Sequence, residues 1–317
     1  MQQLPKDTPI FVAGHRGLIG SAFLRRFEKD GFTNVLTEGR EALDLTDQRA
    51  VLEYFQLKRP KVVLLCAARV GGIVENRDHP AEFITENLDI QLSVIKAAYQ
   101  TGVEKFLFFG SSCMYPRECL QPMQESSLFA GRPEDTSLPY AVAKLAGLIT
   151  CLSYNAQYGG NRFMVAIPNN AYGPNDDFDP KSSHVLSALI RKFHDAKVGN
   201  QKSITLWGTG TPRREFVHAD DIVDASLFLL LRAPADLQYP INIGVGEDYS
   251  IRELASIVAD VIGFGGTIEF DASHPDGSPR KLLDSSRLEE LGWAAKIELK
   301  AGIRETYEWF LDNREAL

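Results

Sequence analysis

Residues 11–23 read FVAGHRGLIGSAF and place Gly14, Gly17 and Gly20 in a G-x-x-G-x-x-G spacing between an apolar run and a helical pattern. Glycines in such a turn allow a tight bend and a close approach of backbone to phosphate, and the N-terminus of the following helix attracts the anion. Glycines also make plain turns, so the position of the triplet at a first strand-to-helix junction carries the weight. The expected dinucleotide-binding residues are Gly14, Arg16, Gly17, Leu18, Ile19 and Gly20.

The first half of the chain alternates short β-rich apolar runs with longer helical patterns, which is typical of a parallel sheet covered on both faces. The expected strands are 9–14, 34–39, 61–68, 105–112 and 163–170. The expected helices are 18–31, 50–58, 81–102 and 140–159. The predicted fold class is therefore α/β, with a doubly wound parallel sheet of the Rossmann type.

After residue 173 the pattern changes to a Pro- and Asp-rich loop, followed by expected helices at 183–196 and 250–263. The second of these begins with a Ser250 to Glu253 capping box. Residues 240–246 read PINIGVG and are expected to return to the main sheet. The predicted division is a dinucleotide-binding domain of 1–173 plus about 217–245, and a smaller α+β substrate domain of 174–216 plus 246–317.

The composition limits the classes of partner. The chain has 317 residues, 44% hydrophobic and 24% charged, with a net charge of −8, so a broad surface for nucleic acid or anionic membrane is not expected. No apolar stretch approaches the ~20 residues that a membrane span needs, and the first residues do not resemble a signal peptide. We expect a cytoplasmic protein. Neither the four cysteines nor the histidines show a metal-ligand spacing, so no metal site is expected.

The second expected strand runs into TEGREALDL and indicates the kind of nicotinamide cofactor. An acid at this position is typical of NAD sites, whereas an arginine accommodates the 2′-phosphate of NADP. Arg40 and Arg16 together favour NADPH. The alternative is that Arg40 pairs with a surface acid while Glu38 holds the ribose. Asp44 and Leu45 are expected beside the adenine.

Tyr140 and Lys144 in LPYAVAK are four residues apart and lie on one helix face. A nearby ammonium stabilises a phenolate, so Lys144 is expected to lower the pKa of Tyr140 from about 10 toward working pH. This spacing alone is common on solvated helices. It gains weight because a strand ending in GSSCMYP, residues 110–116, also precedes it.

These features together resemble the extended short-chain dehydrogenase/reductase family, in which a hydroxyl at a strand end joins the Tyr and the Lys. The family spacing selects Ser111, four residues before Tyr115, and leaves Ser112 structural. Nucleotide-sugar dehydratases of this family carry an Asp-Glu pair after the hydroxyl. Here Ser112 and Cys113 stand instead, so elimination of water is disfavoured.

A closer resemblance, over essentially the whole chain, is to the family of GDP-L-fucose synthases, NADPH-dependent 3,5-epimerases and 4-reductases of GDP-4-keto-6-deoxy-D-mannose. It is carried by the strings GHRGLIGS, AARVGGIVEN, GSSCMYP, YAVAKLAG, YGPNDDFDP, LWGTGTPRREFVHADD and DGSPRKLLD. The resemblance implies that Cys113 and His184 are the base and acid of epimerisation, and that Lys144 and His184 also meet the cofactor. Taken alone, such a Cys is most often a core residue and such a His a cap or surface group.

The same resemblance implies substrate contacts. They involve Asn170, Val185, Leu189, Lys192, Trp207, Arg214 and His274. The chain departs from the family pattern at Lys192, where Arg is common, and at His274, where Lys is common. The alternatives are therefore the same chemistry on a related GDP-4-keto sugar, as in GDP-L-colitose or 6-deoxyheptose synthesis, and a C4-reductase without epimerase activity. A catalytically dead NADP-binding regulator is the alternative outside the enzymes. The family is typically dimeric, and helices 82–100 and 140–158 are expected to pair in a homodimer.

Overall fold

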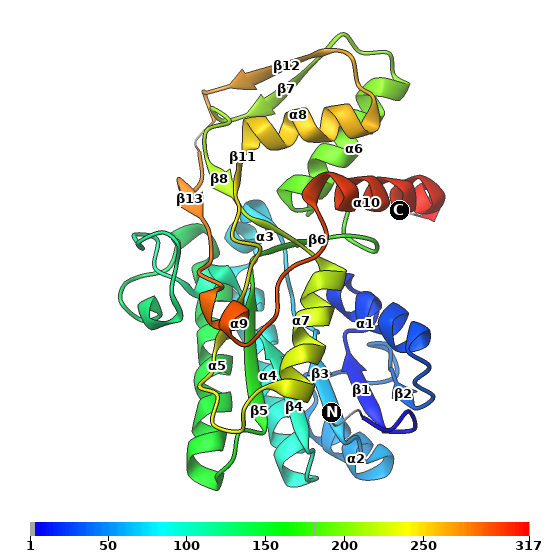
Figure 1. The fold of residues 1–317 in the computed structure, drawn as a ribbon, viewed down its shortest axis with the longest axis vertical. Helices are drawn as coiled ribbons and strands as arrows, with labels where there is room; N and C mark the ends of the chain where they lie inside the picture. Colours follow the sequence, from blue (N-terminus) through cyan, green and yellow to red (C-terminus); the bar gives the residue numbers. More distant parts are fainter. Residues whose placement is uncertain (1–3, 180–181, 275, 317) are drawn as a thin grey trace.

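The computed structural model describes residues 4–179, 182–274 and 276–316. Its centre is a six-stranded sheet in the order β10-β5-β4-β3-β1-β2, in which all neighbours are parallel (Figure 1). The strands are β1 Ile10–Ala13, β2 Val35–Leu36, β3 Val62–Leu65, β4 Lys105–Phe109, β5 Phe163–Pro168 and β10 Ile241–Ile243. The predicted fold class is confirmed, and residues 240–246 do return to the main sheet.

Helices cover both faces of this sheet. Helices α1 and α7 pack together, and α2, α4 and α5 form a continuous second layer. The helices are α1 Leu18–Lys29, α2 Gln48–Lys58, α3 Ile73–Asp78, α4 Pro80–Gln100, α5 Leu138–Tyr158 and α7 Ala219–Arg232. Strands β1, β3 and β5 are buried along their whole length, which explains why they read as unbroken apolar runs rather than as alternating patterns.

A second hydrophobic core lies beyond the carboxyl ends of these strands (Figure 1). Three helices and a parallel strand pair build it: α6 Val185–Val198, α8 Ile251–Ile262, α10 Leu299–Asn313, β7 Ser203–Trp207 and β12 Thr267–Asp271. The predicted capping box of Ser250 and Glu253 starts α8, and Gly263 ends it in the left-handed conformation.

Short strands join the two cores. The β6 Asn170–Tyr172 strand pairs in parallel with β9 Phe216–His218. A three-stranded sheet in the order β11-β8-β13 consists of β11 Tyr249–Ser250, β8 Arg213–Arg214 and β13 Arg280–Lys281. Short helix α9, Ser286–Glu290, follows β13.

The chain passes between the two cores one more time than the predicted domain division implies. Leu283, Leu288 and Trp293 pack in the core of the main sheet, although they fall within 246–317. Only with α10 does the chain return to the smaller core. Residues near β13 therefore belong to the junction between the two cores.

One helical segment of the described chain, Asp135–Tyr158, is long and apolar enough by length and composition to cross a membrane, a length of apolar chain that the sequence analysis did not expect. Packing explains its composition, because α5 lies against α4 and the sheet. A Cβ on Gly147 would come within 2.4 Å of the Phe108 ring and 2.5 Å of Gln91 Oε1. The small residue therefore allows a close helix–sheet contact.

Candidate active site

A cavity of about 550 Å³ lies at the carboxyl ends of the main-sheet strands, where a doubly wound sheet places its ligands. The turn after β1, the ends of β3, β4 and β5, the start of α5 and His184 line it. The predicted cofactor residues in its wall are Gly14, Gly17, Leu18, Ile19, Gly20, Arg40, Asp44, Leu45, Lys144 and His184. Arg16 lies outside the wall, with its guanidinium beside Gly39 in the turn after β2.

The turn before α1 fits a pyrophosphate. No side chain caps this helix, so its first backbone N–H groups remain available. A Cβ on Gly14 would lie 2.6 Å from Ala67 N, and one on Gly20 would lie 2.1 Å from Gly14 O, so these two glycines allow the turn to pack. A Cβ on Gly17 would meet only Gly14 O at 3.6 Å. The remaining open space and the helix N-terminus suit an anion.

Two residues were considered for recognition of the adenosine ribose, Glu38 for its hydroxyls and Arg40 for a 2′-phosphate. Both line the cavity. Arg40 donates to Glu86 Oε1 at 2.6 Å, so the acid pairing considered as an alternative exists in this structure, and Arg69 bonds the same carboxylate at 3.0 Å. Burial opposes ionisation of Glu86, but these two arginines outweigh it and hold its pKa below the ordinary value. Asp44 accepts from Thr46 N and Oγ1 and so closes a local turn.

Ser111, Tyr140 and Lys144 meet in this cavity. Ser111 caps the short 3₁₀ turn Ser112–Met114 after β4, and its Oγ accepts from the Cys113 N–H at 3.2 Å. Ser112 is buried, and Tyr115 fastens the same turn by donating to Asn242 Oδ1 at 2.6 Å.

The predicted effect of Lys144 on Tyr140 is wrong for this structure. Burial, together with the negative charge of Cys113, raises the pKa of Tyr140, while a hydrogen bond with Ser111 acts the other way. Lys144 Nζ instead donates to Phe109 O at 2.9 Å and lies 5.8 Å from the centroid of the Tyr140 ring. Burial lowers the pKa of Lys144 to about 8, partly offset by Cys66 and Cys151.

Cys113 has a cationic neighbour that the sequence analysis missed. Lys281 Nζ lies 3.8 Å from Cys113 Sγ. Burial opposes ionisation of this thiol, but the Lys281 charge and hydrogen bonds from Ser111, Ser137 and Lys281 outweigh it, so the pKa of Cys113 lies below its ordinary value. Lys281 stands in the string DGSPRKLLD, yet no local pattern connects it with a residue 168 positions away.

His184, the other residue expected in epimerisation, is the N-cap of α6 and reaches the same cavity. A buried carboxylate, Asp176, lines the cavity with it. Asp176 accepts from Ser187 Oγ and from Asp177 N. Burial raises the pKa of Asp176, whereas Ser187 and His184 favour its ionised form. Asp176 was also missed, because an aspartate in a Pro- and Asp-rich loop looks like a turn residue.

The predicted substrate residues fall into three groups. Asn170 lines the cavity and donates to Glu215 O at 2.7 Å, and Val185 follows His184. Trp207 is 71% exposed and stacks on His274, with ring centroids 4.5 Å apart and planes at 18°. The others lie on different elements: half-buried Arg214 is on β8 and interacts electrostatically with Cys113, Leu189 lies in the smaller core, and Lys192 donates to Thr205 O on β7.

The chain is similar to known proteins along nearly its whole length. A model described as the NAD dependent epimerase/dehydratase family matches residues 10–244. The chain is 49% identical over 308 residues to GDP-L-fucose synthase 1 of Arabidopsis thaliana, covering 97% of this chain and 94% of that one. It is 47% identical over 313 residues to GDP-L-fucose synthase of Escherichia coli (strain K12), covering 96% and 97%.

Two solved structures resemble the whole fold. A GDP-L-fucose synthetase from Naegleria fowleri bound to NADP has a TM-score of 0.91 at 28% identity, covering 99% of this chain and 96% of that one. A GDP-6-OMe-4-keto-L-xylo-heptose reductase from C. jejuni also has a TM-score of 0.91, at 36% identity, covering 98% and 100%.

Proposed function

The chain belongs to the NAD dependent epimerase/dehydratase family, and from this premise we propose that it converts GDP-4-keto-6-deoxy-D-mannose to GDP-L-fucose. The reaction is 3,5-epimerisation followed by NADPH-dependent reduction at C4, so the protein is an NADP-dependent oxidoreductase with epimerase activity. One observation carries this most directly. A single cavity joins the glycine turn to Ser111, Tyr140 and Lys144 and also contains Cys113 beside a cation.

Epimerisation needs a base and an acid on opposite faces of a carbon next to the ketone. The carbonyl acidifies that carbon, so the Cys113 thiolate takes its proton and leaves an enolate. Ser111 and Tyr140 hold the enolate oxygen, and the His184 imidazolium returns a proton to the opposite face. Cys113 then releases its proton to solvent and His184 regains one, so the cycle serves C3 and C5 in turn.

Reduction uses the same oxygen site. When bound, NADPH supplies a hydride to C4. Tyr140 donates its phenolic proton to the C4 oxygen as charge develops there, and its raised pKa keeps the phenol protonated at neutral pH until that moment. Lys144 lines the same cavity, with Nζ bonded to Phe109 O, and would hold the nicotinamide ribose.

We assign the nucleotide part of the substrate to the crevice between the two cores. These cores follow the predicted domains of 1–173 plus 217–245 and of 174–216 plus 246–317, except that Leu283, Leu288 and Trp293 pack with the main sheet. Trp207 and His274 offer a flat exposed surface for a guanine base. Arg214 suits a diphosphate because its fork donates parallel hydrogen bonds. Asn170, Val185 and Lys192 complete the contacts, and buried Leu189 anchors its own helix α6 in the smaller core.

We also propose a cytoplasmic homodimer that pairs through α4 and α5. Val142 and Ile149, seven residues apart on one side of α5, are 40% and 46% exposed, and a second copy would remove this apolar side from water. Light scattering after size-exclusion chromatography tests the assembly. A monomer at micromolar concentration would contradict it.

The function is tested by incubating the protein and NADPH with a panel of GDP-4-keto sugars and identifying the products by NMR. We expect GDP-L-fucose from the 6-deoxy-D-mannose ketone, with one NADPH oxidised per product. A product reduced at C4 with C3 and C5 unchanged would identify a reductase alone, the second candidate that the resemblance to the heptose reductase favours. If the protein binds NADPH but no sugar causes NADPH to be oxidised, the protein would be the catalytically dead NADP-binding regulator.

A further inference from the structure

The contact between Lys281 and Cys113 joins two distant parts of the chain. Lys281 Nζ, on β13, lies 3.8 Å from Cys113 Sγ, in the turn after β4. Lys281 is half-buried, and within the described residues no carboxylate lies at ion-pair distance from its ammonium. The Cys113 thiol is therefore the group beside this cation that can take a negative charge.

The other groups that face Cys113 come from three elements. Ser111 and Ser137 offer hydroxyl hydrogen bonds, and Arg214 on β8 adds a second positive charge. Tyr140 on α5 is a neutral phenol. Asp276 and Glu134 face Arg214 and partly neutralise it, so Lys281 is the cation with the more direct effect on the thiol.

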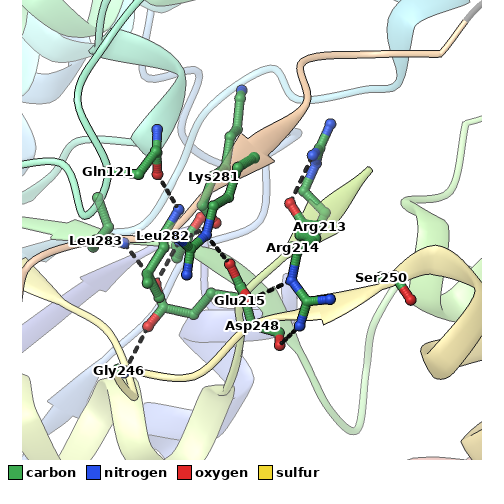
Figure 2. A network of polar contacts seen from close by, with 12 residues as sticks. Gln121, Arg213, Arg214, Glu215, Gly246, Asp248, Ser250, Lys281, Leu282 and Leu283 are labelled. Atoms are coloured by element: carbon green, nitrogen blue, oxygen red, sulfur yellow. Dashed lines mark hydrogen bonds and ion pairs between the residues drawn. The ribbon is translucent and has the colours of Figure 1, made fainter. Parts of the chain in front are cut away.

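The backbone of Lys281 is held on both sides (Figure 2). Strand β13 pairs in parallel with β8, with Lys281 opposite Arg214. The carbonyl of Lys281 accepts from Glu215 N and from Asn169 Nδ2, each at 3.3 Å. Leu282 N donates to Gln121 Oε1 at 2.9 Å.

Glu215 extends this support to the next residue. Its buried carboxylate accepts from Leu283 N at 3.0 Å. The two residues that follow Lys281 are thus fixed by hydrogen bonds, as Figure 2 shows, so the backbone from which the lysine side chain extends to Cys113 has a defined position.

We propose that Lys281 is a positioning residue that holds Cys113 as a thiolate before substrate arrives. The state of the thiol is a property of the free protein. Its consequence, a base ready to remove the proton beside the ketone, rests on the proposed function. Arg214 and Lys281 then differ in their main role: Arg214 would bind the diphosphate of the proposed substrate, and Lys281 stabilises the charge on the sulfur.

The first test measures the thiol without substrate. Iodoacetamide alkylation of Cys113 is followed against pH by peptide mass spectrometry, which separates it from Cys66, Cys119 and Cys151. An opposite charge at this distance lowers a pKa by about one to three units. Lys281→Met should therefore move the midpoint up by at least about one pH unit and slow alkylation at pH 7 about tenfold.

Two variants separate charge from structure. Lys281→Arg keeps the cation and should restore most of the low midpoint, and Lys58→Met, an exposed lysine on α2 outside the cavity wall, should match the wild type. NADPH binding by fluorescence verifies that each variant is folded. A Lys281→Met profile that superposes on the wild-type profile overturns the proposal, whatever happens to turnover.

The second test connects the thiol to epimerisation. In heavy water, deuterium entry at C3 and C5 of the keto sugar should fall about tenfold in Lys281→Met at pH 7 and recover toward the wild-type rate at pH 9. A rise in KM alone, with an unchanged alkylation midpoint, would make Lys281 a substrate ligand and overturn the proposal. The alkylation midpoint could shift in Lys281→Met while deuterium enters neither variant nor wild type. That result would support the pairing of Lys281 with the Cys113 thiolate and contradict the proposed function.

Discussion

At the scale of single residues, Cys113 and Tyr140 share one cavity and influence each other's protons. A negative sulfur raises the pKa of the nearby phenol, in addition to the effect of burial. The thiolate thus helps Tyr140 to keep the proton that it must later give. The two reactions use opposite protonation states of neighbouring groups, and each state favours the other.

Lys144 should give cofactor binding a pH limit. Burial lowers its pKa to about 8, so the ammonium present at pH 7 is lost as the pH rises through 8. NADPH affinity, measured by fluorescence titration, should weaken above pH 8 by up to about tenfold per pH unit.

Lys144→Arg provides the control, because a guanidinium stays charged throughout this range. Its affinity should be independent of pH between 7 and 10, whatever its absolute value. An unchanged pH limit in this variant would assign the limit to another group.

Glu86 should tune the preference for NADPH. Its carboxylate bonds Arg40, the residue that meets the 2′-phosphate in the proposed site, and so competes with that phosphate. Glu86→Gln should strengthen NADPH binding by a few-fold, in keeping with an exposed pair worth about 1 kcal/mol or less, and leave NADH unchanged.

The matched control for this change is Glu82→Gln, because Glu82 pairs with Arg69 but not with Arg40. It should leave the ratio of the two dissociation constants near the wild-type value. Equal effects of both variants would mean that the overall charge of α4, rather than the Arg40 contact, determines the preference.

At the scale of elements, helix α7 begins at a histidine that must stay neutral. His218 Nδ1 accepts from Asp220 N at 3.3 Å as the N-cap, and its Nε2 is buried without a hydrogen-bond partner, 3.9 Å from Glu305. Burial lowers the pKa of His218 to about 4. In the unfolded chain His218 takes up a proton near pH 6.5, whereas in the folded chain it does so only near pH 4. The free energy of unfolding is therefore highest above pH 6.5 and falls as the pH decreases toward 4.

The loss from this site should be on the order of 3 kcal/mol. Urea denaturation at pH 7 and pH 4.5 measures it. His218→Asn should be less stable at pH 7 but should lose less between the two pH values, whereas exposed His79→Asn should behave like the wild type. If His218→Asn and the wild type lose the same free energy of unfolding between these pH values, protonation of His218 does not contribute to acid unfolding.

How far the elements can be predicted from sequence depends on what holds them. The main strands were predicted because burial on both faces forces unbroken apolar runs such as 62–65. Strands β8, β11 and β13 were not, because two residues each leave no periodicity and their pairing is set by tertiary contacts. The same limit hid the contact of Lys281 with Cys113 and the direction of the Tyr140 pKa, since neither distance nor burial is visible in local sequence.

At the scale of the whole molecule, one carboxylate joins the two cores. Glu215, between β8 and β9, accepts from Val245 N at 2.7 Å and Gly246 N at 2.9 Å after β10, and from Leu283 N at 3.0 Å after β13. A Cβ on Gly244 would lie 2.5 Å from Glu215 Oε1, so the close approach requires glycine there. Asn169 Nδ2, after β5, also donates to this carboxylate, so four segments from distant parts of the sequence meet at this side chain.

Glu215→Gln should destabilise the protein by about 1–3 kcal/mol for each buried N–H that loses its acceptor, because an amide nitrogen would face donors. Urea denaturation measures the change. Glu289→Gln, on the exposed side of α9, is the matched control and should be neutral. Equal stability of the two variants would show that the junction does not depend on the carboxylate.

This junction also determines how the molecule can move. The cores cannot separate at Glu215 without leaving a buried carboxylate unpaired, so we expect any hinge axis to pass through this point. The outer end of the smaller core, where β7 and β12 lie in Figure 1, includes the stacked pair Trp207 and His274, and we expect this edge to be the part that swings. Product release would require displacement of that edge while the sulfur, the phenol and their neighbours stay in place, so that the protein can reset between turnovers without rebuilding its reactive centre.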